Sequence, residues 1–301
     1  MLWARRLFLV LLLAFGALVL LGAYTGYRLS HPSPDRFHAD VQTAGTALQQ
    51  ALGAAPAQAY LADFRFQASP STCGPTTLRN VLTSLGVQVD SERALFGDHR
   101  LAGWKALGLG MTLDELARLA RANTSYPVDI LRIGSLKAFR AVLAEANAPG
   151  TRLIVNFDRA PLFGVAVGHF SPIGGYDPTT GLVTLLDVTE GYGFSLVPDA
   201  LLFRATRTED PLSGRARGLL RIVDPTLASG GWRPSASGIG FGGALPVHAG
   251  QAPWPGRPGT ASPVATLPRG PVMQTAWPSR AKDGASGARF HRAVRALRPL
   301  T

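Results

Sequence analysis

Cys73 is the single cysteine of the 301-residue chain, and its surroundings favour a role as a nucleophile. Apolar side chains recur at helical spacing after it, up to Gly86: Leu78, Val81, Leu82 and Leu85. This spacing predicts a helix over about 75–85, with Cys73 at its N-terminus. Unpaired backbone amides and the helix dipole would there stabilise a thiolate and lower the pKa of the thiol. A lone cysteine is more commonly an inert core residue, so the hypothesis depends on partners elsewhere in the sequence.

His169 and Asp187 form a candidate pair of such partners. They lie in two apolar segments on either side of the turn-forming sequence at 177–181. A hairpin centred on Pro178 would place them directly opposite each other, and one centred on Thr179 would make them diagonal neighbours on one face. A carboxylate beside a histidine fixes its tautomer and stabilises the imidazolium that accompanies a thiolate. The spacing therefore predicts contact between the two side chains.

Gln67, six residues before Cys73, is a candidate for stabilising negative charge on a reacting carbonyl group. Its side-chain amide and the backbone amide of Cys73 are donors of the kind that hold an oxyanion. Taken alone, a surface glutamine is the more ordinary interpretation. The presence of His169 and Asp187 is what favours the functional one.

Two segments of the sequence carry a resemblance to a known family. The stretch 168–176 reads GHFSPIGGY and is followed at 185–188 by LLDV, and both closely resemble the signature of phytochelatin synthases, as does 67–85 around the cysteine. The similarity covers about 64–223. It implies a papain-like α+β fold with a Cys, His, Asp triad and an oxyanion glutamine. The corresponding residues here are Cys73, His169, Asp187 and Gln67.

The resemblance also implies a reaction, which is cleavage of the Cys-Gly bond of glutathione through a γ-glutamylcysteinyl thioester. The chain looks like the short bacterial form, because it has no second cysteine, and for that form the family suggests hydrolysis more than transfer to a second glutathione. The segment after Asp187 reads Thr189, Glu190, Gly191, Tyr192, where the family usually has basic and aromatic residues. This difference weakens the expectation of a binding site for a second glutathione, the acceptor of the acyl group.

Substrate and cofactor expectations follow from the same resemblance. Arg217, Asn156 and Gly168 are candidates for binding substrate, although Arg217 and Asn156 fit structural or surface roles equally well. No cofactor is expected, and Cd²⁺ or Zn²⁺ would enter as a thiolate complex of glutathione. No protein metal site is predicted, because the remaining histidines are scattered without ligand spacing: His31, His38, His99, His248 and His291.

Two other functions remain open from the sequence alone. Triad chemistry does not choose the acyl donor, so an exported papain-like peptidase acting on other peptides is the alternative enzyme. A non-catalytic, membrane-tethered module whose basic tail engages lipid or cell envelope is the alternative of a different class. The intact set of Cys73, His169 and Asp187 argues against the second alternative.

The elements that must position these residues change character along the chain. Capping signals predict helices after Thr112, which is followed by Glu115 at the third helical position, and after Ser135. Strands are predicted over 153–157, 165–176, 182–188 and 218–223. Helices followed by an antiparallel sheet indicate an α+β domain.

Charge and composition divide the chain into four parts. The net charge is +11, yet nine Lys and Arg residues against two Asp lie in 224–301, so 29–223 is nearly neutral and predicts no nucleic-acid partner. The Pro- and Gly-rich tail at 224–301 is predicted to be disordered. Residues 61–223 form the predicted catalytic domain. Residues 29–60 are predicted to be a spacer or peripheral helix, with an Ala- and Gln-rich stretch at 35–52 that can form a helix.

The N-terminal segment 1–28 contains an apolar run. Arg5 and Arg6 precede 18 uncharged residues at 7–24, which as a helix would extend about 27 Å. The small residues that a signal-peptidase site needs are poorly represented, which favours an uncleaved anchor over a cleaved signal peptide. The positive-inside rule then predicts a bacterial inner-membrane protein facing the periplasm, or a periplasmic or secreted protein if cleavage occurs.

Overall fold

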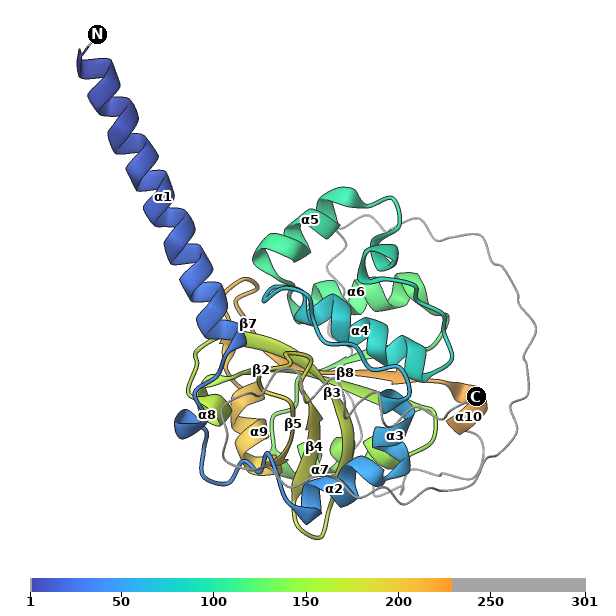
Figure 1. Ribbon diagram of the computed structural model, residues 1–301. Coiled ribbons are helices and arrows are strands. Elements are labelled where there is room, and N and C mark those ends of the chain that lie inside the picture. The colour runs from blue at the N-terminus through green and yellow to red at the C-terminus, as the bar shows by residue number, and fades with distance from the viewer. Residues whose placement is uncertain (1, 229–301) are drawn as a thin grey trace, which may run out of the picture.

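The computed structural model describes the chain from Leu2 to Ala228, and 229–301 lie outside the described residues (Figure 1). The predicted disordered tail therefore falls almost entirely outside the described part. Its first residues form a short helix, α10 (Pro225–Ala228). This helix is preceded by the buried Asp224, whose backbone N–H donates to the carbonyl of Gly150.

A six-stranded antiparallel sheet in the order β1-β8-β2-β3-β4-β5 forms the centre of the domain. Its strands are β1 (Val128–Leu131), β2 (Thr151–Asp158), β3 (Gly168–Asp177), β4 (Leu182–Leu186), β5 (Phe194–Pro198) and β8 (Gly218–Val223). A separate two-stranded hairpin consists of β6 (Glu209–Asp210) and β7 (Arg215–Ala216). The central strand β2 is buried at every residue except Asp158, because helices cover both faces of the sheet.

The helices form two groups about this sheet (Figure 1). The chain contains α2 (Thr46–Gly53), α3 (Ala55–Leu61), α4 (Cys73–Ser84), α5 (Arg100–Leu109), α6 (Leu113–Asn123), α7 (Leu136–Ala144), α8 (Ala160–Phe163) and α9 (Asp199–Thr206). Apolar residues of α4 and α6 pack with Ile154 and Leu220 on one face, whereas those of α7 and α9 pack with Leu153 and Leu219 on the other. The expected α+β class, with a helical first half before the sheet, is confirmed.

Local signals in the sequence located several elements correctly. Helix α4 starts at Cys73 and α6 has the predicted capping box between Thr112 and Glu115. Ser135 caps α7 by accepting a hydrogen bond from the backbone N–H of Ala138. The predicted strand at 218–223 matches β8.

Only part of the 35–52 stretch, which the sequence allows to be helical, forms a helix. A short 3-10 helix (Pro34–Arg36) is followed by extended chain, in which Gln42 forms a bridge with Leu196 beside the sheet edge. Gly45 has a φ of +108°, which interrupts any helix, so α2 begins only at Thr46. Leu48 and Tyr60 are buried, so the segment packs on the domain and is not a free spacer.

The N-terminal helix α1 (Leu2–Ser30) projects away from the domain (Figure 1). Among the described residues it is the one helix that is long and apolar enough to cross a membrane, and none of its apolar window is buried in the protein. Its C-terminal end approaches the domain closely. A Cβ on Gly26 would lie 3.8 Å from Pro70 Cγ, and a Cβ on Gly191 would collide with the carbonyl of Ser30.

Candidate active site

Helix α4 presents Cys73 to the sheet. Cys73 is its first residue, and the thiol is buried with 7% of the residue exposed. The hydroxyl of Thr77, one turn later, donates to the carbonyl of Phe170 at 3.0 Å. Phe170 follows His169 on β3, so this hydrogen bond holds the start of α4 against the strand that carries the histidine.

The same helix fixes the segment that leads to Gln67. The side chain of Asn80 accepts from the backbone N–H of Arg65 at 3.0 Å and donates to its carbonyl at 2.8 Å. The buried Arg79 pairs with Asp63. The backbone N–H of Gln67 then donates to the carbonyl of Val188 at 2.7 Å. Gln67 is thereby held between α4 and the residue that follows Asp187.

The carboxamide of Gln67 has a free acceptor. Its Oε1 is buried and has no hydrogen-bond partner among the described residues. An oxyanion would be held by the Nε2 donor of this amide, and the unpartnered Oε1 has no bearing on that donor. The oxyanion role of Gln67 stays a prediction.

A β-bulge brings His169 and Asp187 to one face of the sheet. Near the turn, Tyr176 pairs with Val183. If that register continued, His169 would pair with the residue three positions after Asp187, and the two side chains would lie on opposite faces of the sheet. The register shifts between Ile173 and Gly175, so that Ile173 pairs with Leu185 and the offset becomes two residues. The two side chains are then diagonal neighbours on one face.

The His169 and Asp187 side chains of the triad are in contact and buried. His169 Nε2 lies 3.0 Å from Asp187 Oδ1, and the two side chains are 2% and 0% exposed. The carboxylate also accepts from the backbone N–H of Thr189 at 2.7 Å. Because Nε2 is engaged by the carboxylate, Nδ1 is the ring nitrogen left for the Cys73 thiol.

Arg159 is a fourth member of this cluster that the sequence analysis missed. Its Nη2 lies 2.6 Å from both carboxylate oxygens of Asp187 and 2.9 Å from His169 Nε2, and it donates to Thr189 Oγ1 at 2.8 Å. The guanidinium also lies over the Tyr192 ring, 3.7 Å from its centre. Arg159 is 2% exposed. Strand pairing explains its position: Phe157 pairs with His169, so a residue two positions further along is a diagonal neighbour of the histidine.

These contacts set the charge state of the site. Burial opposes the thiolate of Cys73, but the nearby His169, a hydrogen bond from the backbone of Phe170 and the charge of Arg159 outweigh it and lower the pKa of the thiol. Burial and Arg159 oppose protonation of His169, yet Asp187 and Cys73 outweigh them and raise its pKa. Burial likewise disfavours the Asp187 carboxylate, and the Arg159 and His169 charges overcome it and hold its pKa far below the usual range. The site therefore favours a thiolate–imidazolium pair.

These directions predict a bell-shaped pH dependence of kcat/KM. The acidic limb should lie below the ordinary thiol pKa of 9.0, because activity is lost as Cys73 is protonated. The alkaline limb should lie above the ordinary imidazole pKa of 6.5, because activity is lost as His169 loses its proton. Initial rates measured across pH, with the protein checked for folding at each pH, test this. A profile that rises monotonically through neutral pH would contradict the ion pair.

Arg217 lies beside the triad strand. Its guanidinium fills the space where a Cβ on Gly168 would project, which explains the glycine next to His169. The side chain donates from Nε to Thr208 Oγ1 at 3.2 Å and lies 4.0 Å from Asp210. Gly168 thus begins the strand that carries His169, with Arg217 packed against it, and substrate binding by these two residues stays a prediction.

Asn156 has a different position. It is 1% exposed, and its Nδ2 donates to the carbonyl of His169 at 3.3 Å. Its Oδ1 is buried without a partner in the described part of the chain. Of the two roles considered for this residue, these contacts favour support of the histidine strand.

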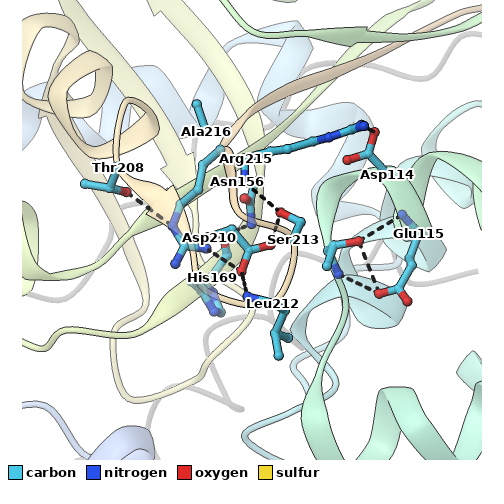
Figure 2. A network of polar contacts seen from close by, with 12 residues as sticks. Asp114, Glu115, Asn156, His169, Thr208, Asp210, Leu212, Ser213, Arg215 and Ala216 are labelled. Carbon is cyan, nitrogen blue, oxygen red and sulfur yellow. Dashed lines mark hydrogen bonds and ion pairs between the residues drawn. The ribbon is translucent and has the colours of Figure 1, made fainter. Parts of the chain in front are cut away.

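The β6–β7 hairpin closes this side of the site (Figure 2). Within it, Asp210 accepts from the backbone N–H of Leu212 and from the hydroxyl of Ser213, both at 3.1 Å. Arg215 pairs with Asp114 of α6 at 3.3 Å, which joins the hairpin to the helical half. Among the described residues, no three His, Cys, Asp or Glu side chains gather as a metal site.

The chain is similar to several curated glutathione γ-glutamylcysteinyltransferases. It is 30% identical over 213 residues to form 3 of Lotus japonicus, covering 65% of this chain and 44% of the relative. It is 26% identical over 216 residues to form 1 of Arabidopsis thaliana, covering 66% and 44%. For the Schizosaccharomyces pombe enzyme, identity is 28% over 172 residues, covering 53% and 41%. The chain thus spans less than half the length of these relatives.

Among solved structures, the chain has similarity to a peptidase domain and a protease, both from transporters. One is the peptidase domain of Streptococcus ComA, a bi-functional ABC transporter, with 16% identity and a TM-score of 0.36 over 54% of this chain and 98% of that domain. Another is a double glycine motif protease from an AMS/PCAT transporter, with 14% identity and a TM-score of 0.34 over 54% and 91%.

The family itself is established by sequence. A profile described as phytochelatin synthase matches residues 32–219, more than half of the chain. The matched span includes the connected Cys73, His169 and Asp187 together with Gln67 and Arg217. The chain therefore belongs to the phytochelatin synthase family, and it has the expected α+β arrangement of a cysteine-bearing helix against an antiparallel sheet.

Proposed function

We propose that this protein cleaves the Cys-Gly amide of glutathione through a γ-glutamylcysteinyl thioester on Cys73. The observation that carries the proposal is the buried pair of His169 and Asp187, 3.0 Å apart, beside a thiol whose pKa the histidine lowers. A purely structural cysteine does not need such a pair. The named activity of the similar transferases supports glutathione as the acyl donor.

The first half-reaction forms the thioester. The Cys73 thiolate attacks the cysteinyl carbonyl carbon, and a sulfur–carbon bond forms while the carbonyl electron pair moves onto oxygen. The backbone amide of Cys73 and the carboxamide of Gln67 stabilise this oxyanion. Its collapse breaks the carbon–nitrogen bond, and protonated His169 gives its proton to the departing glycine nitrogen.

The second half-reaction consumes the thioester. Neutral His169 removes a proton from water, whose oxygen attacks the thioester carbonyl, and the carbon–sulfur bond breaks to release γ-glutamylcysteine. The thiolate and the imidazolium are then restored. If the amino group of a second glutathione attacks instead, the product is a two-unit phytochelatin. Asp187 stays ionised throughout and holds the ring orientation.

Hydrolysis is the favoured outcome of this second step. Transfer requires a second anionic glutathione to compete with water at about 55 M, which needs a positioned, electropositive acceptor site. Both arginines near the triad are engaged, Arg159 by Asp187 and Thr189, and Arg217 by Thr208 and Asp210. Glu190, which follows Thr189, adds negative charge to the segment where the second glutathione would lie.

Metal ions enter this proposal as part of a substrate. Cd²⁺ or Zn²⁺ would reach the site as a thiolate complex of glutathione, with no cofactor bound by the protein. The protein would be held in a bacterial inner membrane by α1, with Arg5 and Arg6 on the cytoplasmic side and the domain in the periplasm.

Product analysis tests the reaction. The full chain in detergent or lipid, incubated with millimolar glutathione, should release glycine and γ-glutamylcysteine as main products by mass spectrometry, with phytochelatin minor unless metal is added. Peptides without a γ-glutamyl group serve as control substrates, and Cys73→Ala as the control protein. Dominant phytochelatin at early times without metal would overturn the preference for hydrolysis. Cleavage of the control peptides without cleavage of glutathione would overturn the substrate assignment.

A further inference from the structure

The outward side of α5 is apolar. Its residues Leu101, Trp104 and Leu109 are 87%, 69% and 69% exposed. On a helical projection they share one arc with Lys105, whereas Ala106, which is 1% exposed, faces the domain. A surface helix of a soluble domain normally has this polarity reversed, with charged residues outside. Outside α1, these three make up most of the exposed large apolar residues in the described chain, with Leu212 and Leu227 as the others.

The loop before Cys73 connects α5 to α1. A Cβ on Gly26 of α1 would lie 3.8 Å from Pro70 Cγ, and one on Gly110, the residue after α5, would lie 3.9 Å from the carbonyl oxygen of Ser71. Two consecutive loop residues therefore bridge the apolar helix and the end of α5. Figure 1 shows α5 on the side of the domain from which α1 leaves, level with the last turns of that helix.

The length of α1 places a bilayer surface at this level. Its 29 residues extend about 44 Å, and a hydrocarbon core is about 30 Å thick. The apolar run ends at Tyr24, and both Tyr24 and Tyr27 are exposed, as expected for aromatic residues at a membrane interface. Gly26, which contacts the loop, lies between these two tyrosines.

We propose that α5 is a second membrane contact, in which Leu101, Trp104 and Leu109 insert into the interface of the bilayer that α1 crosses. Tryptophan and leucine on one helix face are the composition of an interfacial helix, and Lys105 on the same arc pairs with Glu115 of α6. Arg28 and Arg36 border a cavity of about 290 Å³ beside the end of α1, which suits anionic lipid headgroups. Docking would hold the loop that leads into Cys73 at the membrane surface.

The inference rests on α1 spanning a bilayer, which is part of the proposed function, and site-directed spin labelling separates the two. The full chain with Cys73→Ala carries no other cysteine, so Leu101→Cys, Trp104→Cys or Leu109→Cys each gives a single nitroxide site. The variants are reconstituted in vesicles of phosphatidylcholine and phosphatidylglycerol. Collision rates with oxygen, which concentrates in lipid, and with a water-soluble nickel chelate are then compared.

The α5 sites should give oxygen-rich, nickel-poor collision ratios typical of the interface. Leu13→Cys in α1 should read deeper, and Leu227→Cys, an exposed leucine on α10, should read as aqueous. Aqueous ratios on α5 with a deep Leu13→Cys would overturn the docking of α5 and leave the anchor standing. Aqueous ratios at both would overturn the anchor and the docking together. Low collision with both reagents, accompanied by spin–spin broadening, would assign the face to a second copy of the chain and overturn the lipid contact.

Discussion

Replacing Cys73 with serine should lower glycine release from glutathione by at least about a thousandfold, because the reaction depends on an ionised sulfur. A serine hydroxyl does not ionise under these conditions, and the contacts that lower the thiol pKa, from His169, Phe170 and Arg159, are too weak to change that. Cys73→Ala should lose activity to the same extent. Release of glycine by the full chain, measured by mass spectrometry, gives the rate.

Two further measurements separate loss of the nucleophile from loss of the fold. Both variants should keep the thermal unfolding temperature close to that of the wild type, since each replaces or removes a single atom at the start of α4. Acid quenching of the wild type during turnover should trap one γ-glutamylcysteinyl group per chain, and neither variant should trap any. Retained turnover in Cys73→Ala would show that another residue forms the acyl intermediate.

The start of α4 could be predicted because its signal is local. Apolar spacing after Cys73 and the glycine at 86 define the helix, and a helix start fixes the backbone amides around its first residue. The capping box of α6 and the Ser135 N-cap of α7 are likewise encoded within four residues. These predictions needed no knowledge of which segments meet in space.

The contact between His169 and Asp187 was predicted from spacing, but the β-bulge that produces it was not. The register next to the turn matches neither of the two hairpins considered, and taken alone it would separate the side chains onto opposite faces. Beyond the bulge, the pairing of Ile173 with Leu185 is the one expected for the hairpin centred on Thr179. The bulge at Gly174 corrects the register by one residue. A Cβ on Gly174 would lie 3.0 Å from Leu186, so the glycine permits the close packing that the bulge needs. Spacing alone does not reveal an inserted residue.

Arg159 could not be recognised from the sequence, because its role depends on the pairing of β2 with β3. A single arginine after a strand has no periodic pattern and no motif. The structure makes it a neighbour of the triad through the pairing of Phe157 with His169 and through its backbone hydrogen bond to the carbonyl of Val167 at 3.0 Å. The main feature of the site that the structure adds is thus the charge of Arg159, whose position depends on the pairing of β2 with β3.

Replacing Arg159 with methionine should therefore alter both stability and the pH profile. Removing one partner of a buried ion pair costs about 3–5 kcal/mol of unfolding free energy, because Asp187 is left charged with fewer contacts. The guanidinium lowers the pKa of both Cys73 and His169, so its loss should raise both and move both limbs of the pH profile to higher pH. Misorientation of the Asp187–His169 pair should lower kcat/KM by roughly a hundredfold near neutral pH.

Arg140→Met is the matched control for this experiment, because Arg140 also pairs with a buried carboxylate, Asp199 at 2.7 Å, but away from the triad. Asp199 keeps a hydrogen bond from the Tyr176 hydroxyl, so the stability loss should be smaller, and the pH profile should not move. Arg159→Lys should restore part of the charge effect without the hydrogen bonds that one guanidinium nitrogen donates to Asp187 and Thr189. Both limbs of the pH profile of Arg159→Lys should lie between those of the wild type and those of Arg159→Met. If Arg159→Met lowers stability while both limbs stay in place, the arginine supports the fold alone, and the thiolate–imidazolium pair is set by Asp187 without it.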